Sequence, residues 1–205
     1  MKKLLIAMLM AVPAMAATAQ DNTWEQPEKQ EVKNANPDQK YLAGAVPEVD
    51  GRVVFKTTIK ASGKTKRQIF DIVVAQLRKM VKEPNQLEQS RVTMADEAQP
   101  EQAAASLQEW LVFKNKPLNL DRTRLFYTLM ADISDGELKL TMTRIHYLYD
   151  EEREPMTYRA EEWITDRYGL NKKQNKLARV SGKFRRKTID RKDYIFNKFE
   201  QLLTK

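Results

Sequence analysis

The chain has 205 residues, with 36 lysines and arginines against 28 aspartates and glutamates, and a formal net charge of +8. It contains no cysteine, which excludes a disulfide framework, a thiolate zinc site and a lipid anchor on cysteine. The length suits one ordinary domain, which its apolar core must hold together.

The first 19 residues have the pattern of a secretory signal peptide. Lys2 and Lys3 precede an apolar run at residues 4–12, and small residues follow at residues 14–19. The apolar run is shorter than the roughly 20 residues that a helix needs to cross a bilayer, and no later segment is long and apolar enough. We therefore predict an exported protein without a transmembrane segment, periplasmic or secreted and not a lipoprotein, that loses residues 1–19.

Residues 20–50 are predicted to be a mostly disordered leader or linker, and residues 51–205 a single domain. The leader carries Pro27, Pro37 and Pro47 and has no sustained apolar period. Nothing in this segment predicts a contribution to the core.

A strand and a long helix begin the predicted domain. Residues 52–60 alternate apolar and polar side chains, as in a half-buried strand. From Thr65 to residue 81 the apolar side chains share one helical face, and Thr65 with Gln68 has the spacing of a capping box. The helix must therefore lie on another apolar surface.

The junction Gly63-Lys64-Thr65 raises the question of a phosphate-binding loop. Such a loop needs a second glycine five residues before the Gly-Lys pair, and Thr58 occupies that position. We interpret the junction as a strand-to-helix turn with a threonine cap.

Four more strands are predicted at residues 91–95, 107–115, 123–133 and 137–149. In the last of these, the apolar residues change parity: Leu138, Leu140 and Met142 are followed by Ile145, Tyr147 and Tyr149. A change of parity within one strand predicts a bulge or a bend.

Two helices are predicted at the end of the chain. Residues 160–168 suggest a short helix, and Thr188 is expected to cap a terminal helix whose apolar face includes Ile195 and Phe199. One antiparallel sheet with the helices packed on one face buries all of these apolar surfaces. We therefore predict an α+β fold of the helix-grip type, with the order β-α-β-β-β-β-α-α.

Three stretches carry a resemblance to a known family: VPEVDGRVVF at residues 46–55, and residues 118–152 and 160–190. They resemble a family of exported bacterial proteins catalogued as a domain of unknown function with a TATA-box-binding-protein-like (TBP-like) fold. The resemblance implies a sheet with helices packed on it. It implies no activity and supplies no site residues.

No motif predicts catalysis, a metal or a cofactor, although we leave enzymatic activity open. His146, the one histidine, lies in a predicted strand, without a cysteine partner or a nucleophile elbow in the sequence. The acidic residues at 150–154 and 161–166 lack the spacing of a calcium loop. We interpret them as a solvated loop and a helix start.

The strongest feature is a basic segment between residues 170 and 192, with ten basic residues and one acidic residue, a local charge of +9. We expect it to bind an anionic lipid, a glycan or an acidic protein. The candidate site residues are Lys172, Lys173, Lys183, Arg185, Arg186 and Lys187. The alternative is that these cations serve as internal counter-charges to the acidic patch. Nucleic acid is not an expected partner, because an exported protein meets little of it.

The sequence thus favours a non-catalytic exported binding or structural module. The alternative function is a small-ligand carrier or a hydrolase that uses a cavity between the sheet and the long helix. Polar groups that converge in a pocket of a few hundred cubic ångströms at that place would favour the alternative.

Overall fold

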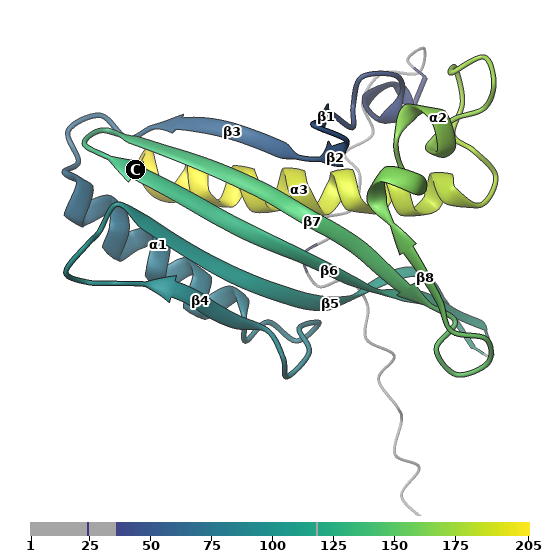
Figure 1. Cartoon of the computed structure of the whole chain (residues 1–205), viewed down its shortest axis with the longest axis horizontal. Helices are drawn as coiled ribbons and strands as arrows, with labels where there is room; N and C mark the ends of the chain where they lie inside the picture. The colour runs from purple at the N-terminus through teal and green to yellow at the C-terminus, as the bar shows by residue number, and fades with distance from the viewer. Residues whose placement is uncertain (1–23, 25–35, 118) are drawn as a thin grey trace, which may run out of the picture.

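The computed structural model describes residue 24 and residues 36–117 and 119–205. The signal peptide predicted at residues 1–19 lies outside the described residues. The elements in chain order are η1 (Gln39–Tyr41), β1 (Glu48–Val49), β2 (Arg52–Val53), β3 (Phe55–Lys60), α1 (Lys66–Met80), β4 (Arg91–Ala95), β5 (Gln102–Lys116), β6 (Asn119–Ser134), β7 (Glu137–Tyr149), β8 (Met156–Arg159), η2 (Ala160–Glu162), α2 (Asp166–Gly169) and α3 (Ser181–Leu203) (Figure 1).

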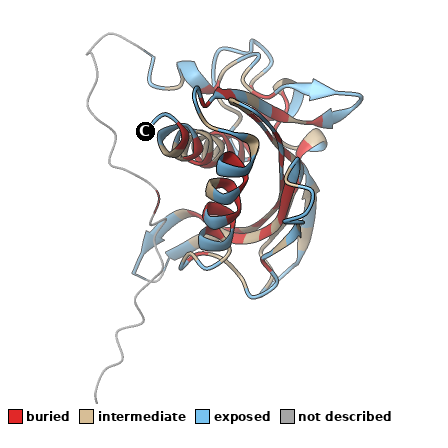
Figure 2. Ribbon diagram, turned by 90° about the vertical axis from the view of Figure 1, so that its left-hand side faces the viewer, coloured by how far each residue is buried: buried red, intermediate tan, exposed pale blue. Residues whose placement is uncertain are grey.

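Six strands form one antiparallel sheet in the order β3-β7-β6-β5-β4, with β8 also paired to β7. The sheet curves around α1 and α3, which lie together on its concave side (Figure 2). The buried apolar residues of the sheet, of α1 and of α3 belong to one hydrophobic cluster. The predicted α+β fold, with helices on one face of an antiparallel sheet, is confirmed.

The bulge predicted in β7 is confirmed at Arg144, whose φ is +56°. On the neighbouring β6, Phe126 pairs with His146 but Thr128 pairs with Thr143, so β7 carries one extra residue. The first half of β7 pairs with β3 and the second half with β8. The bulge therefore keeps the apolar residues of both halves on the concave side.

The start of α1 also agrees with the prediction. Gln68 N donates to Thr65 Oγ1 at 3.3 Å, and Thr65 N donates to Gln68 Oε1 at 2.9 Å, which completes the capping box. Phe70, Val73 and Leu77 are buried against the sheet. The turn Gly63-Lys64-Thr65 thus begins a capped helix.

Two helix predictions are wrong in detail. Residues 160–168 form η2 and α2 and not a single helix, because Trp163 leaves the helical conformation and stacks on Tyr158 at 3.8 Å. Thr188 does not cap the last helix, which begins seven residues earlier at Ser181. Thr188 is instead buried within α3, where its hydroxyl lies 2.7 Å from the Tyr147 hydroxyl.

The prediction of a disordered leader is wrong for residues 36–50, whereas residues 20–23 and 25–35 of that leader lie outside the described residues. Residues 36–50 form η1 and β1, and Tyr41 and Val46 are buried in the common core. The prediction failed because a few anchoring side chains, and not a regular apolar period, attach this segment to the domain. Of the described helices, none combines the length and the apolar character that crossing a membrane requires.

Candidate functional site

The predicted basic site divides into two parts in the structure. Lys172 and Lys173 are exposed on the loop between α2 and α3. The other four residues, Lys183, Arg185, Arg186 and Lys187, lie on α3 itself. The structure therefore does not bring the six together as one exposed surface.

Arg185 is fully buried, contrary to its proposed role in contacting a partner. Its guanidinium donates to three backbone carbonyls, those of Tyr41, Leu42 and Ile164, at 2.6–2.7 Å, and pairs with Asp166 at 2.7 Å. Burial lowers the pKa of Arg185 although Asp166 acts to raise it. An arginine remains protonated in proteins, so the charge persists and is neutralised inside the molecule.

Lys183 and Arg186 also have partners within the domain. Lys183 Nζ lies 2.6 Å from Asp121 and 3.1 Å from the Tyr149 hydroxyl. Arg186 pairs with Asp38, and Lys187 is half-buried on the same helix. The interpretation as internal counter-charges thus describes Lys183, Arg185 and Arg186 better than contact with a partner does.

Lys172 and Lys173 belong to a group of five cations that are exposed together in and beside the loop between α2 and α3, at one end of the molecule (Figure 1). We call them the cationic tip: Arg167, Lys172, Lys173, Lys176 and Arg179. No aspartate or glutamate occurs between residues 167 and 180. None of the five forms an ion pair with the described part of the chain; Arg167 lies over the Tyr168 ring at 5.2 Å. Their charges are therefore open to solvent.

The loop that carries the tip has a defined shape. Leu170 and Leu177 form an isolated antiparallel bridge at its base. Asn171 Oδ1 accepts from the backbone N–H groups of Asn175 and Lys176, at 3.1 and 3.3 Å. The loop therefore holds its lysines outward without help from a partner.

Buried Arg185 supports the base of this loop. A Cβ at Gly169 would lie 2.8 Å from both the Arg185 side chain and the Ile164 carbonyl oxygen, so only glycine fits beside the arginine. The contacts of Arg185 join η1, α2 and α3. Sequence reasoning placed Arg185 in the binding surface, whereas the structure makes it a support for that surface.

Three tip residues, Arg167, Lys176 and Arg179, were not among the six predicted site residues, although Lys176 and Arg179 lie within the predicted basic segment. The signal that identifies them is the complete lack of acidic residues from 167 to 180, which is readable in the sequence. Averaging the charge over a segment that extends to residue 192 obscured it.

Tyr41 fixes η1 to α3 next to Arg185. Its hydroxyl donates to Asp190 at 2.7 Å, and Lys40 also pairs with Asp190. Burial, followed by the hydrogen bond to Asp190, raises the pKa of Tyr41 to about 12.

This shift predicts a change of stability at alkaline pH. In the unfolded chain a tyrosine ionises near pH 10, about two units lower, so the unfolded state loses its proton first and stability falls as pH rises from about 10 to about 12. Near neutral pH, Tyr41→Phe should reduce the free energy of unfolding by about 1.5–3 kcal/mol. Urea unfolding of the wild type and of Tyr41→Phe near neutral pH and near pH 12 should show a smaller difference in the free energy of unfolding at the higher pH. A difference that stays constant up to pH 12 would contradict the assignment.

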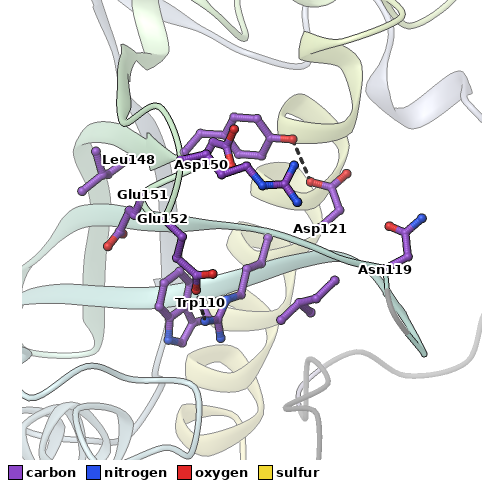
Figure 3. A pocket seen from close by; sticks show the side chains of 11 residues that line it. Trp110, Asn119, Asp121, Leu148, Asp150, Glu151 and Glu152 are labelled. Carbon is purple, nitrogen blue, oxygen red and sulfur yellow. Dashed lines mark hydrogen bonds and ion pairs between the residues drawn. The ribbon is translucent and has the colours of Figure 1, made fainter.

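A second feature is a polar hollow of about 530 Å³ where β6 begins and β7 ends. Figure 3 shows Asp121 and Asn119 on one side and Trp110, Glu151 and Glu152 on the other. Arg122 covers the Trp110 ring at 3.7 Å, and Arg124 pairs with Glu151 at 2.7 Å. The hollow presents both signs of charge, and several of its charged groups already have partners: Arg122 pairs with Glu152, Glu151 with Arg124 and Asp121 with Lys183.

Other candidate groups have structural partners. His146 stacks on Phe126 at 4.4 Å, and its Nδ1 lies 3.1 Å from the Arg144 carbonyl oxygen. Within the described residues, no three histidine, aspartate or glutamate side chains gather as metal ligands would. Between sheet and helices, Arg191 and Glu109 form a buried ion pair.

Comparisons with known proteins agree with the fold. Residues 55–148 match the family model described as a domain of unknown function (DUF4468) with TBP-like fold. The solved structure of a DUF4468 family protein from Bacteroides ovatus ATCC 8483 is 38% identical, with 82% of this chain and 96% of that chain covered and a TM-score of 0.75. A TBP-like protein from Parabacteroides distasonis ATCC 8503 is 16% identical, with coverages of 77% and 96% and a TM-score of 0.60, and supports the fold alone. Among curated proteins, none matches the chain.

Proposed function

Because the chain belongs to the DUF4468 family, whose description names a TBP-like fold and no activity, we propose a function from its own surface. The protein is a non-catalytic, exported binding module that holds an anionic partner on its cationic tip. The observation that carries this proposal is the presence of five exposed cations within thirteen residues, with no acidic residue among them.

The electrostatics of the tip favour contact with a partner. An exposed cluster of one sign attracts opposite charge over roughly the screening length, about 10 Å at 0.1 M salt. Three cations on α3, Lys183, Arg185 and Arg186, are less available to the partner, because Asp121, Asp166 and Asp38 neutralise them. The tip therefore presents unneutralised positive charge at one end of the domain.

Export determines which anions the tip would meet. The pattern at residues 1–19 supports removal of a signal peptide and a location in the periplasm or outside the cell. Anionic lipid, acidic glycan and acidic protein are the partners available there. Nucleic acid is not expected.

The alternative, a carrier or hydrolase with a cavity between the sheet and α1, has less support. The polar groups that converge between the sheet and the helices centre on Arg191 and Glu109, which are fully buried in a direct ion pair and are also contacted by Glu83 and Gln86. The hollows of about 530 and 360 Å³ are lined by residues at other places.

The proposal is tested with a heparin fragment as a generic polyanion and with protein purified from the exported fraction of the producing cells. The intact mass of this protein should lack residues 1–19. The tip triple variant carries Lys172→Gln, Lys173→Gln and Lys176→Gln. We expect it to bind heparin at least about tenfold more weakly at low salt, since each contacting cation contributes up to about 1 kcal/mol.

A control triple variant has the same change of charge elsewhere. It carries Arg78→Gln, Lys79→Gln and Lys82→Gln, three exposed residues at the end of α1 and just after it. Its heparin affinity should fall less than about threefold, and both variants should unfold as the wild type does. If both variants lose affinity equally, binding follows net charge, and the tip is not the site.

A further inference from the structure

Two exposed apolar side chains flank the cationic tip. Of the described residues, six large apolar or aromatic side chains are exposed, and Tyr168 (41%) and Val180 (55%) are two of them. Their positions in the chain lie close together at the base of the loop, because Ser181, which follows Val180, donates a hydrogen bond from Oγ to the Tyr168 carbonyl oxygen at 2.5 Å. The tip therefore combines cations with an apolar edge.

Val180 is unusual at its position in the helix. It is the N-cap residue of α3 and makes no side-chain capping hydrogen bond. Serine, threonine, aspartate or asparagine stabilises a helix at this position, whereas valine does not. Neither helix stability nor solvation explains an exposed valine here, and this points to an apolar environment supplied from outside the domain.

We propose that the cationic tip docks on an anionic lipid bilayer surface, with Tyr168 and Val180 entering the layer between headgroups and acyl chains. This inference rests on the proposed function and names its partner. Amphipathic surfaces of this composition, with Lys and Arg beside Tyr and aliphatic residues, bind in the membrane interface. The lysines then lie at the level of the anionic headgroups.

The apolar edge distinguishes a bilayer from the other anionic partners. A sulfated glycan neutralises lysines but offers no apolar layer to Tyr168 or Val180. An acidic protein would need a matching apolar patch, whereas any fluid bilayer supplies one. The defined shape of the loop lets it dock without rearrangement of the sheet.

The expected effects on vesicle affinity follow from two contributions, the charge of the tip cations and the apolar surface of Tyr168 and Val180. Each cation near an anionic surface is worth about fivefold, so the tip triple variant should lose about 100-fold. Removing about 60 Å² of buried apolar surface should cost about tenfold. The double variant Tyr168→Ser with Val180→Ser should therefore lose about tenfold on vesicles while keeping the heparin affinity of the wild type.

The experiment is co-sedimentation of the exported protein with vesicles of phosphatidylcholine alone, or of phosphatidylcholine with phosphatidylglycerol as the minor component. Binding should require phosphatidylglycerol and should weaken from about 0.1 M to about 1 M salt, as the screening length falls from about 10 to about 3 Å. The matched control for the apolar edge is Val49→Ser with Met130→Ser, two exposed apolar residues on other elements. That control should bind vesicles as the wild type does.

The outcomes separate the two proposals. Heparin binding by the tip without vesicle binding overturns the lipid inference and leaves the proposed function in place. No binding to either probe at low salt overturns both. Vesicle binding that the control double variant weakens as much as the Tyr168/Val180 variant also overturns the lipid inference, because the apolar contribution would then not belong to the tip.

Discussion

Arg185→Met is expected to reduce the free energy of unfolding by about 3–5 kcal/mol, the range typical of removing one partner from a buried ion pair. The change leaves the carbonyl oxygens of Tyr41, Leu42 and Ile164 without their donor, and Asp166 without its cation. It also removes the contacts by which Arg185 joins η1 and α2 to α3. Urea unfolding of wild type and variant near neutral pH measures the difference.

The adjacent arginine provides the control. Arg186 is half-buried, pairs with Asp38 and lies over the Tyr41 ring at 4.9 Å. Arg186→Met should cost about 1 kcal/mol, the scale of a surface ion pair. Arg185→Lys should not restore stability, since a point charge cannot donate to four acceptors as the planar guanidinium does. Equal small losses in Arg185→Met and Arg186→Met would show that the buried contacts contribute little.

The expected loss of stability in Arg185→Met determines which residues can be substituted to test the binding site. Any variant that removes Arg185 confounds loss of binding with loss of the fold that supports the tip. Substitutions at Lys172, Lys173 and Lys176 change exposed charges only. Binding experiments should therefore change the loop lysines and leave the helix arginines in place.

The sheet and α1 were predictable because their signals are local. Thr65 and Gln68 are three residues apart and cap the helix through contacts within one turn. The change of parity between Met142 and Ile145 records the bulge at Arg144 directly. In contrast, β8 is only four residues long, and the first half of β5 contains three alanines, so neither has a strong apolar period.

The buried arginines of α3 were not predicted because charge was taken as a sign of exposure. The helical spacing does contain the answer: Phe184, Thr188, Ile195 and Phe199 define an inner stripe, with Arg185 and Arg191 also on it. Starting the helix at Thr188 hid the first two turns of this stripe. Asp166, Asp121 and Asp38 pair with Arg185, Lys183 and Arg186 and lie 19 to 148 residues away from them in the chain, so only the tertiary fold identifies these pairs.

The second buried arginine forms the ion pair between α3 and the sheet. Arg191 Nε lies 2.8 Å from Glu109, and Arg191 Nη2 lies 2.8 Å from Glu83. Arg191 and Glu109 have no exposed surface, and Gln86 donates to the remaining oxygen of Glu109 at 3.0 Å. Burial raises the pKa of Glu109, although Arg191 acts to lower it. Removing Arg191 would therefore leave a buried carboxylate that favours its neutral form.

Arg191→Met should accordingly cost about 3–5 kcal/mol near neutral pH, and adding Glu109→Leu should restore most of the loss, because a packed apolar pair is about as stable as a buried ion pair. In Arg191→Met, the pKa of Glu109 should be raised in the folded state. The folded state then binds a proton more readily than the unfolded state, in which a glutamate has a pKa near 4.3. The loss in the free energy of unfolding should therefore become smaller as pH falls toward about 4.3. Urea unfolding of the wild type, both single variants and the double variant near pH 5 and pH 8 measures the coupling. A double variant no more stable than Arg191→Met would mean that the ion pair fixes the position of α3 and does more than neutralise a charge.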